Sequence, residues 1–233
     1  MPLPSPQAIL FDLDGTLLDT APDMAAALNQ LRAEHGLAPM PFAEIRPNVS
    51  NGARGLLGIG LGIGPDHDTY HQLRDRFLAL YAADLAVHTC LFPGLEALVD
   101  SLEQRALPWG VVTNKPGGLT HRLLEALKLE PAVVVCGDEL ERAKPHPDPL
   151  LFAAGKLRLP PATIWYIGDH ERDIIAGNAA HMPTIAGRWG YLDGERPIEA
   201  WGATLVIDHP EDIAGLLSGS GLHAANPDAV DAK

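Results

Sequence analysis

Four carboxylate side chains follow apolar segments of the sequence, at points where strands are expected to end. Asp12 and Asp14 come directly after the apolar run at 8–11, and Asp169 and Asp173 follow a later apolar run. Carboxylates that share a small site repel one another and do not all ionise unaided. A hard divalent cation such as Mg²⁺ relieves this repulsion, and it prefers oxygen ligands. The spacing therefore predicts a magnesium site, provided that the fold brings the four groups together.

Two further polar residues have places that suit a phosphoryl group. Thr113 follows the apolar run at 109–112, and Lys144 lies in a loop before an expected helix. Their hydroxyl and ammonium groups, with backbone amides near Asp14, are the donors that non-bridging phosphate oxygens need. One carboxylate can attack phosphorus and form an acyl phosphate. A second carboxylate two residues away can protonate the leaving oxygen and then activate water.

Each of these residues also has an ordinary structural explanation. The Asp-Leu-Asp-Gly-Thr segment at 12–16 could form only a turn, and Thr113 could cap the next helix. Lys144 could be a solvated surface residue, and Asp173 could simply orient it as an ion pair. The functional explanation fails only if all of these structural explanations are correct at the same time, at successive strand ends. We therefore favour a shared site.

The order of the apolar segments predicts an α/β fold with a Rossmann-like parallel sheet. The expected strands are 8–11, 109–112, 132–135, 163–167, 184–186 and 204–207, and the expected helices between them are 95–104, 119–127, 150–157 and 174–180. This alternation is typical of parallel sheets with helices on both faces. Ligands bind at the carboxyl ends of such strands. Since neighbouring strands lie about 4.8 Å apart, the polar groups listed above can converge there.

The segment between the first strand and residue 85 has a different pattern. Apolar residues recur at helical spacing in 25–37 and 70–81. Between them a glycine-rich loop that contains Arg54 is expected at 47–64. We therefore expect a helical insertion in an otherwise alternating chain. The predicted division is a discontinuous catalytic core at 1–18 and 85–217, a helical cap domain at 19–84 and a flexible tail at 218–233.

Composition limits the partners and the compartment. The 233 residues carry a formal net charge of −13, which argues against nucleic acid and anionic membranes as partners. We find no apolar run that could cross a membrane and no secretory signal. Cys90 and Cys136 lack metal-type spacing, so we expect two buried thiols in a reducing compartment. These features predict a cytoplasmic protein. The phosphoryl-binding residues described above predict a small phosphorylated metabolite as its partner, and we expect a monomer or homodimer.

The polar motifs together resemble the four signatures of the haloacid dehalogenase superfamily. The matching segments are Asp12-Leu13-Asp14-Gly15-Thr16, Thr113-Asn114, Lys144-Pro145, and Gly168-Asp169 with Asp173. The resemblance extends over about residues 7–215. It implies that Asp12 is the nucleophile and Asp14 the general acid and base. It also implies that the phosphoryl group is bound by Thr113, Asn114 and Lys144.

The same resemblance implies a magnesium site and a cap. Mg²⁺ would be held by Asp12, the backbone carbonyl of Asp14, and Asp169, with Asp173 in support. The insertion at 19–84 resembles the small helical cap of members that act on small soluble substrates.

Two features narrow the reaction within this superfamily. Dehalogenases lack the second carboxylate of the first motif, so Asp14 favours phosphoryl chemistry. Phosphonate hydrolases need a cap lysine to form a Schiff base, whereas the first lysine of this chain is Lys115. Sugar phosphomutases share the core and the size of the cap, and this alternative stays open.

Two branches of phosphatases resemble the chain. Phosphoglycolate phosphatases are similar at 11–22, 51–54, 111–116 and 144–149, and N-acetylmuramic acid 6-phosphate phosphatases at 109–116, 189–191, 201–203 and 208–210. We take 2-phosphoglycolate as the first substrate and the sugar phosphate as the alternative. Arg54 is predicted to reach the non-reacting end of the substrate, or else to be solvated.

Proteins that do not turn over substrate form the remaining alternatives. A phospho-receiver module also places Asp, Thr and Lys at the ends of parallel strands. This chain is about twice the length of one such module, and its helical insertion follows the first strand directly. A binding protein of the same fold that lacks activity would have eroded motifs, and none is eroded here.

Overall fold

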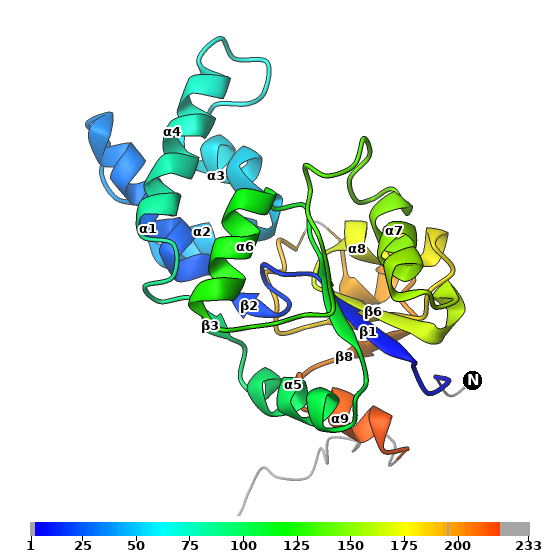
Figure 1. The fold of residues 1–233 in the computed structure, drawn as a ribbon. Helices are drawn as coiled ribbons and strands as arrows, with labels where there is room; N and C mark the ends of the chain where they lie inside the picture. Colours follow the sequence, from blue (N-terminus) through cyan, green and yellow to red (C-terminus); the bar gives the residue numbers. More distant parts are fainter. Residues whose placement is uncertain (1–2, 195, 220–233) are drawn as a thin grey trace, which may run out of the picture.

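A six-stranded parallel sheet forms the centre of the molecule, as the sequence predicts. The computed structural model describes residues 3–194 and 196–219. The strand order is β5-β4-β1-β6-β7-β8 (Figure 1). The strands are β1 (Ala8–Phe11), β4 (Trp109–Val112), β5 (Val133–Val135), β6 (Ile164–Gly168), β7 (Thr184–Gly187) and β8 (Leu205–Ile207). All five pairings between neighbours are parallel, which confirms the α/β prediction.

Both faces of the sheet are covered by helices. Successive side chains of a strand point to opposite faces, so Ile9 and Phe11 pack into one apolar cluster and Ala8 and Leu10 into another. The first cluster includes residues of α5 (Leu95–Gln104), α6 (Gly117–Ala126) and α9 (Asp212–Leu217). The second includes residues of α7 (Asp148–Leu157) and α8 (Glu171–Ala179). Two short 3₁₀ helices, η2 (Pro161–Thr163) and η3 (Ile198–Trp201), complete this part of the chain.

The insertion after the first strand is helical, but one of its helices differs from the prediction. It contains α1 (Ala21–Glu34), α2 (Phe42–Ile45), the 3₁₀ helix η1 (Arg46–Asn51), α3 (Gly52–Leu61) and α4 (Tyr70–Ala83). The prediction of a glycine-rich loop at 47–64 is wrong for most of its length, because η1 and α3 together extend to Leu61. Gly60 is needed for packing: a Cβ there would lie 2.5 Å from Leu28 Cδ1 of α1.

A short two-stranded ribbon connects the insertion to the sheet. Here β2 (Leu18–Asp19) pairs antiparallel with β3 (Cys90–Leu91). These two strands could not be predicted from the sequence, since two residues are too few to show a period. We propose that this ribbon separates a helical cap at 19–84 from a core at 1–18 and 85–217. The larger apolar cluster nevertheless extends through both parts.

The predictions on membrane spans, on the two cysteines and on the C-terminal tail have different outcomes. Among the described residues, none of the helices combines the length and the apolar character that a membrane span requires. Cys136 is buried as expected, but Cys90 is exposed, so the prediction of two buried thiols is wrong for Cys90. The flexible tail predicted at 218–233 lies outside the described residues from residue 220 on.

Candidate active site

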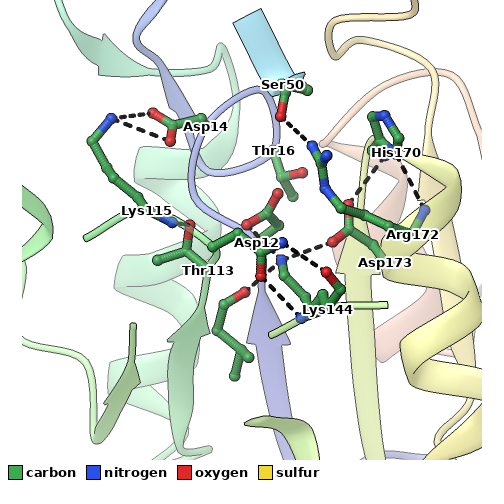
Figure 2. Close-up of polar contacts among 12 residues, drawn as sticks. Asp12, Asp14, Thr16, Ser50, Thr113, Lys115, Lys144, His170, Arg172 and Asp173 are labelled. Atoms are coloured by element: carbon green, nitrogen blue, oxygen red, sulfur yellow. Dashed lines mark hydrogen bonds and ion pairs between the residues drawn. The ribbon is translucent and has the colours of Figure 1, made fainter. Parts of the chain in front are cut away.

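The predicted polar residues converge at the carboxyl ends of three adjacent strands (Figure 2). Asp12 follows β1, Thr113 follows β4 and Asp169 follows β6. Because β1 lies between β4 and β6, Asp12 occupies the centre of the group. The Asp12, Thr113 and Asp169 side chains are all buried, at 5%, 3% and 1% exposure.

Lys144 is the buried cation of the site. Its Nζ lies 2.8 Å from Asp12 Oδ1 and 2.7 Å from Asp173 Oδ1. It also donates hydrogen bonds to the carbonyl oxygen of Val112 (2.8 Å) and to the hydroxyl of Tyr166 (2.7 Å). Burial opposes the charged form of Lys144, but the two carboxylates outweigh this effect and raise its pKa. Lys144 is therefore a cation fixed beside Asp12, and the surface position considered above is wrong.

Asp169 is held by three donors from different parts of the chain. Its carboxylate accepts hydrogen bonds from the hydroxyls of Thr16 and Ser50 and from the backbone N–H of Tyr191, each at 2.9 Å. Burial, together with the negative charges of nearby carboxylates, raises the pKa of Asp169 to about 7. Burial and the charge of Asp173 also raise the pKa of Asp12, although Lys144 opposes this. The site thus concentrates more negative charge than one lysine neutralises.

The carboxylate cluster has the chemistry of a magnesium site. One oxygen from each of Asp12, Asp169 and Asp173 lies within 4.8 Å of the others. Among the described residues, Asp12 Oδ1 is buried without a hydrogen-bond partner, so its contact with Lys144 is an ion pair without hydrogen-bond alignment. A carboxylate oxygen that lacks a hydrogen-bond partner and lies in a cluster of carboxylate oxygens is a suitable ligand for a hard cation such as Mg²⁺.

Asp173 differs from the other two carboxylates because its oxygens are already engaged. Oδ1 contacts Lys144 and accepts a hydrogen bond from Tyr166 Oη at 3.2 Å, and Oδ2 accepts one from the His170 N–H at 3.2 Å. This arrangement favours a supporting position over direct metal binding.

The Asp14 carboxylate lies apart from this cluster and is directed toward Lys115 (Figure 2). Lys115 Nζ is 2.9 Å from Asp14 Oδ1 and 3.2 Å from Oδ2, and the hydroxyl of Thr20 donates to Oδ1 at 2.6 Å. Sequence reasoning missed Lys115 as a site residue. The available signal was its position, directly after Thr113 and Asn114.

Asn114 makes contacts that its predicted phosphate-binding role does not require. Its side-chain amide donates to the carbonyl oxygen of Lys144 at 2.8 Å and accepts from the Lys144 N–H at 3.0 Å. These two bonds fix the loop that carries Lys144. Thr113 Oγ1 accepts a hydrogen bond from the N–H of Lys115 at 3.1 Å, which leaves its own proton available.

Residues of the insertion contact the core directly above the site. Besides the bond from Ser50 to Asp169, the guanidinium of Arg172 donates to the Ser50 carbonyl oxygen. The side chain of Asn51 lies 3.2 Å from His170 Nε2. Burial, with Arg172 close by, lowers the pKa of His170 to about 4, so this imidazole is neutral at pH 7. The structure therefore has the insertion closed over the carboxylates.

A cavity of about 590 Å³ lies between the insertion and the strand ends. It reaches Asp12 and Asp14, and much of the rest of its wall is apolar or aromatic: Met24, Val49, Tyr70, Leu78, Tyr81 and Leu119. Arg54 and Arg74 lie on the insertion side of the same cavity. The expectation that Arg54 lies in a loop is wrong, because it belongs to the first turn of α3. The Arg54 side chain has no hydrogen bond or ion pair with the described residues.

Comparisons with known proteins agree with this geometry. The family described as haloacid dehalogenase-like hydrolase matches residues 9–187. An N-acetylmuramic acid 6-phosphate phosphatase of Pseudomonas putida is 40% identical over 91% of this chain and 96% of its own. A phosphoglycolate phosphatase of Xanthomonas campestris is 41% identical over 89% of this chain and 95% of its own. The crystal structure of a predicted phosphoglycolate phosphatase from Haemophilus somnus has a TM-score of 0.81 at 25% identity, and the match covers 92% of this chain and 99% of that one.

Proposed function

The chain belongs to the haloacid dehalogenase-like hydrolase family, and from this premise we propose that it hydrolyses phosphomonoesters through an aspartyl-phosphate on Asp12. One observation carries the proposal. Asp12 is buried at the end of the central strand, with one carboxylate oxygen beside the ammonium of Lys144, and the residue lines the cavity. A carboxylate at the wall of the cavity can reach the phosphorus of a bound ester.

In the first step, a carboxylate oxygen of Asp12 forms a bond to phosphorus, and the bond from phosphorus to the ester oxygen breaks. Protonated Asp14 gives its proton to that ester oxygen, which leaves as an alcohol. The ammonium of Lys144 and the hydroxyl of Thr113 stabilise the charge on the non-bridging oxygens.

In the second step, water attacks the phosphorus of the acyl phosphate while the Asp14 carboxylate takes a proton from it. The bond between phosphorus and the Asp12 oxygen breaks, which releases phosphate and restores Asp12. The net reaction consumes one ester and one water and yields one alcohol and one phosphate. Contacts from Ser50 and Asn51 would limit the access of other water to the site.

Mg²⁺ would be held by Asp12, Asp169 and the backbone carbonyl of Asp14, with Asp173 orienting Lys144. When bound, the cation supplies positive charge against the phosphate and the surrounding carboxylates. Its presence would also favour the ionised form of Asp169, whose pKa is raised without it.

We propose N-acetylmuramic acid 6-phosphate as the substrate that the cavity supports better, and 2-phosphoglycolate as the second candidate. The cavity of about 590 Å³ lies within the range that accepts ligands of sugar size. A two-carbon acid phosphate would fill only a small part of it. 2-Phosphoglycolate, the first choice from the sequence, is supported by relatives named phosphoglycolate phosphatase at similar identity.

Both candidate substrates carry a carboxylate away from the phosphate. Arg54 and Arg74 are the cationic side chains on the insertion side of the cavity. We propose that Arg54, which lacks an acidic partner among the described residues, binds this carboxylate. Arg74 already contacts Asp75 at 2.8 Å and is therefore the less available of the two.

The test is phosphate release in the presence of Mg²⁺, with the two substrates compared at equal concentrations. Asp12→Asn serves as the blank. A preference for the sugar phosphate would support the assignment from the cavity, and a preference for 2-phosphoglycolate would reverse the order. If neither substrate is hydrolysed faster than by Asp12→Asn, the proposed activity on both is excluded.

A further inference from the structure

A second group of metal-ligating side chains lies at the β5 edge of the sheet. His121 belongs to α6, and Cys136 and Glu139 lie in the loop that follows β5. A ring nitrogen of His121, the sulfur of Cys136 and a carboxylate oxygen of Glu139 all lie within 4.8 Å of one another. None of these three is among the described residues that line the cavity of about 590 Å³. The group is therefore separate from the proposed active site.

The three donor atoms suit a different cation from the carboxylate cluster. Mg²⁺ prefers oxygen ligands, whereas a thiolate together with an imidazole suits Zn²⁺. Zn²⁺ binds four ligands in a tetrahedron at about 2.0–2.3 Å, so its ligand atoms lie roughly 3–4 Å from one another. Side-chain rotations of the exposed His121 and Glu139 can bring the three atoms to this spacing. A water molecule can then be the fourth ligand.

The thiol of Cys136 forms the buried side of this group. Cys136 is 1% exposed. Burial is the main cause that raises the pKa of its thiol to about 12, and the nearby Glu139 adds to the effect. The thiol therefore keeps its proton in the metal-free protein, and a cation that binds there replaces this proton and releases it to solvent. His121 has no hydrogen bond or ion pair with residues 3–194 and 196–219, so its ring nitrogens are free to bind a cation.

Backbone contacts hold the loop at 136–139 in place before any cation binds. The N–H of Gly137 donates a hydrogen bond to the carbonyl oxygen of Lys115 at 3.0 Å. The N–H of Gly117, the first residue of α6, donates to Asp138 Oδ1 at 2.8 Å. These bonds fix the loop to the helix that carries the imidazole. Binding a cation therefore requires little further ordering of the backbone, which favours affinity.

We propose that His121, Cys136 and Glu139 bind one Zn²⁺ ion, with water as the fourth ligand, and that this ion fastens α6 to the loop after β5. The inference goes beyond the proposed phosphatase activity and does not depend on it. Leu119 of α6 and Asp138 of the loop both line the cavity. The ion therefore also stabilises one wall of the cavity without taking part in the reaction.

Titration with Co²⁺ tests the site, because cobalt occupies tetrahedral zinc sites and a bond from Co²⁺ to a thiolate absorbs in the near ultraviolet. The full-length protein is titrated with CoCl₂ in excess MgCl₂, so that Mg²⁺ competes for the carboxylate cluster. We expect a thiolate-to-cobalt absorption band that saturates at one ion per chain. Addition of ZnCl₂ should remove the band as Zn²⁺ replaces Co²⁺.

Three variants assign the ligands. Cys136→Ser should abolish the band. Cys90→Ser removes the exposed cysteine, is the matched control and should keep the band unchanged. Loss of a residue that only supports a metal ligand typically costs 10- to 100-fold in affinity, so His121→Ala, which removes a ligand, should weaken Co²⁺ binding by at least about tenfold. His121 is exposed, so this variant tests the site even if Cys136→Ser does not fold.

Three results would overturn the inference. The first is the absence of a thiolate band in the wild-type protein. The second is a band that is lost in Cys90→Ser and kept in Cys136→Ser. The third is an affinity that is unchanged in both His121→Ala and Glu139→Ala, since the cysteine would then bind cobalt alone. None of these measurements uses phosphate release, so a failure of the proposed phosphatase activity is detected separately.

Discussion

At the scale of single residues, the site consists of carboxylates in excess over buried cations. Lys144 neutralises part of the charge of Asp12 and Asp173, and Asp169 retains a pKa raised to about 7. This imbalance gives the site an affinity for a divalent cation. It also makes that affinity depend on pH, because a proton and a metal ion compete for the same oxygens.

The affinity for Mg²⁺ should therefore weaken as the pH falls below about 7. Below that pH, Asp169 carries a proton in the metal-free enzyme, and Mg²⁺ must displace it. We expect about a tenfold loss of affinity per pH unit below 7 and little change above it. Calorimetric titration with MgCl₂ between pH 5.5 and 8.5, without substrate, measures this directly. An affinity independent of pH in this range would show that Asp169 is not a ligand.

Removing the charge of Lys144 should destabilise the protein. Lys144→Met leaves Asp12 and Asp173 buried beside each other without their cation. Loss of one partner of a buried ion pair typically costs about 3–5 kcal/mol. We expect the free energy of unfolding in urea, measured without Mg²⁺, to fall by about this amount. Lys128→Met, at an exposed position, is the control. A change below about 1 kcal/mol would mean that the carboxylates do not depend on Lys144.

At the scale of elements, the sequence predicted the sheet well and the insertion less well. Strand β4 and helix α5 were predicted with their observed ends, because continuous apolar runs and helical periods are strong local signals. Residues of helix α3 were predicted to form part of a loop, since its glycines are poor helix formers. Its helical state depends on packing against α1, which sequence spacing does not reveal.

The same reasoning applies to the site. Residues at strand ends were predictable, because chain order and sheet geometry place them together. Ser50 was missed, because its contact with Asp169 depends on where the insertion sits on the core. Lys115 was missed although it follows Thr113 and Asn114 directly, because its contact with Asp14 joins the loops that follow two different strands. Arg54 was predicted to bind substrate because of its unusual surroundings in the sequence, but its position on a helix was not predicted.

Two alanine substitutions in α3 should have opposite effects. Gly60→Ala places a Cβ 2.5 Å from Leu28 Cδ1, and we expect a loss of about 1–3 kcal/mol. Gly58→Ala has no atom within 4 Å and should stabilise the helix by up to about 1 kcal/mol. Thermal or urea unfolding followed by circular dichroism measures both. Equal effects of the two changes would contradict the packing of α3 against α1.

At the scale of the whole molecule, the insertion and the core share one apolar cluster. Phe77 of α4 and Phe11 of β1 both belong to it, and each is fully buried. The hydrogen bonds of Ser50 with Asp169 and of Asn51 with His170 add polar contacts between the two parts. These shared contacts favour unfolding of the whole chain as a single unit.

Phe77→Ala tests this cooperativity. Loss of a buried phenylalanine typically costs about 3–5 kcal/mol. We expect one unfolding transition at a lower temperature, and calorimetric and van't Hoff enthalpies that agree. A separate transition at low temperature, with the main transition unchanged, would show that the insertion unfolds independently.

The proposed activity depends on phosphorylation of Asp12, and trapping the phosphoenzyme can detect this step. Asp14→Asn should react with p-nitrophenyl phosphate, whose leaving group needs no acid, but should hydrolyse the intermediate slowly because the base is missing. Acid quenching followed by peptide mass spectrometry should find one phosphoryl group on Asp12, and none in the Asp12→Asn/Asp14→Asn double variant. A phosphoryl group on another residue, or none during active turnover of the wild-type enzyme and Asp14→Asn, would contradict the account.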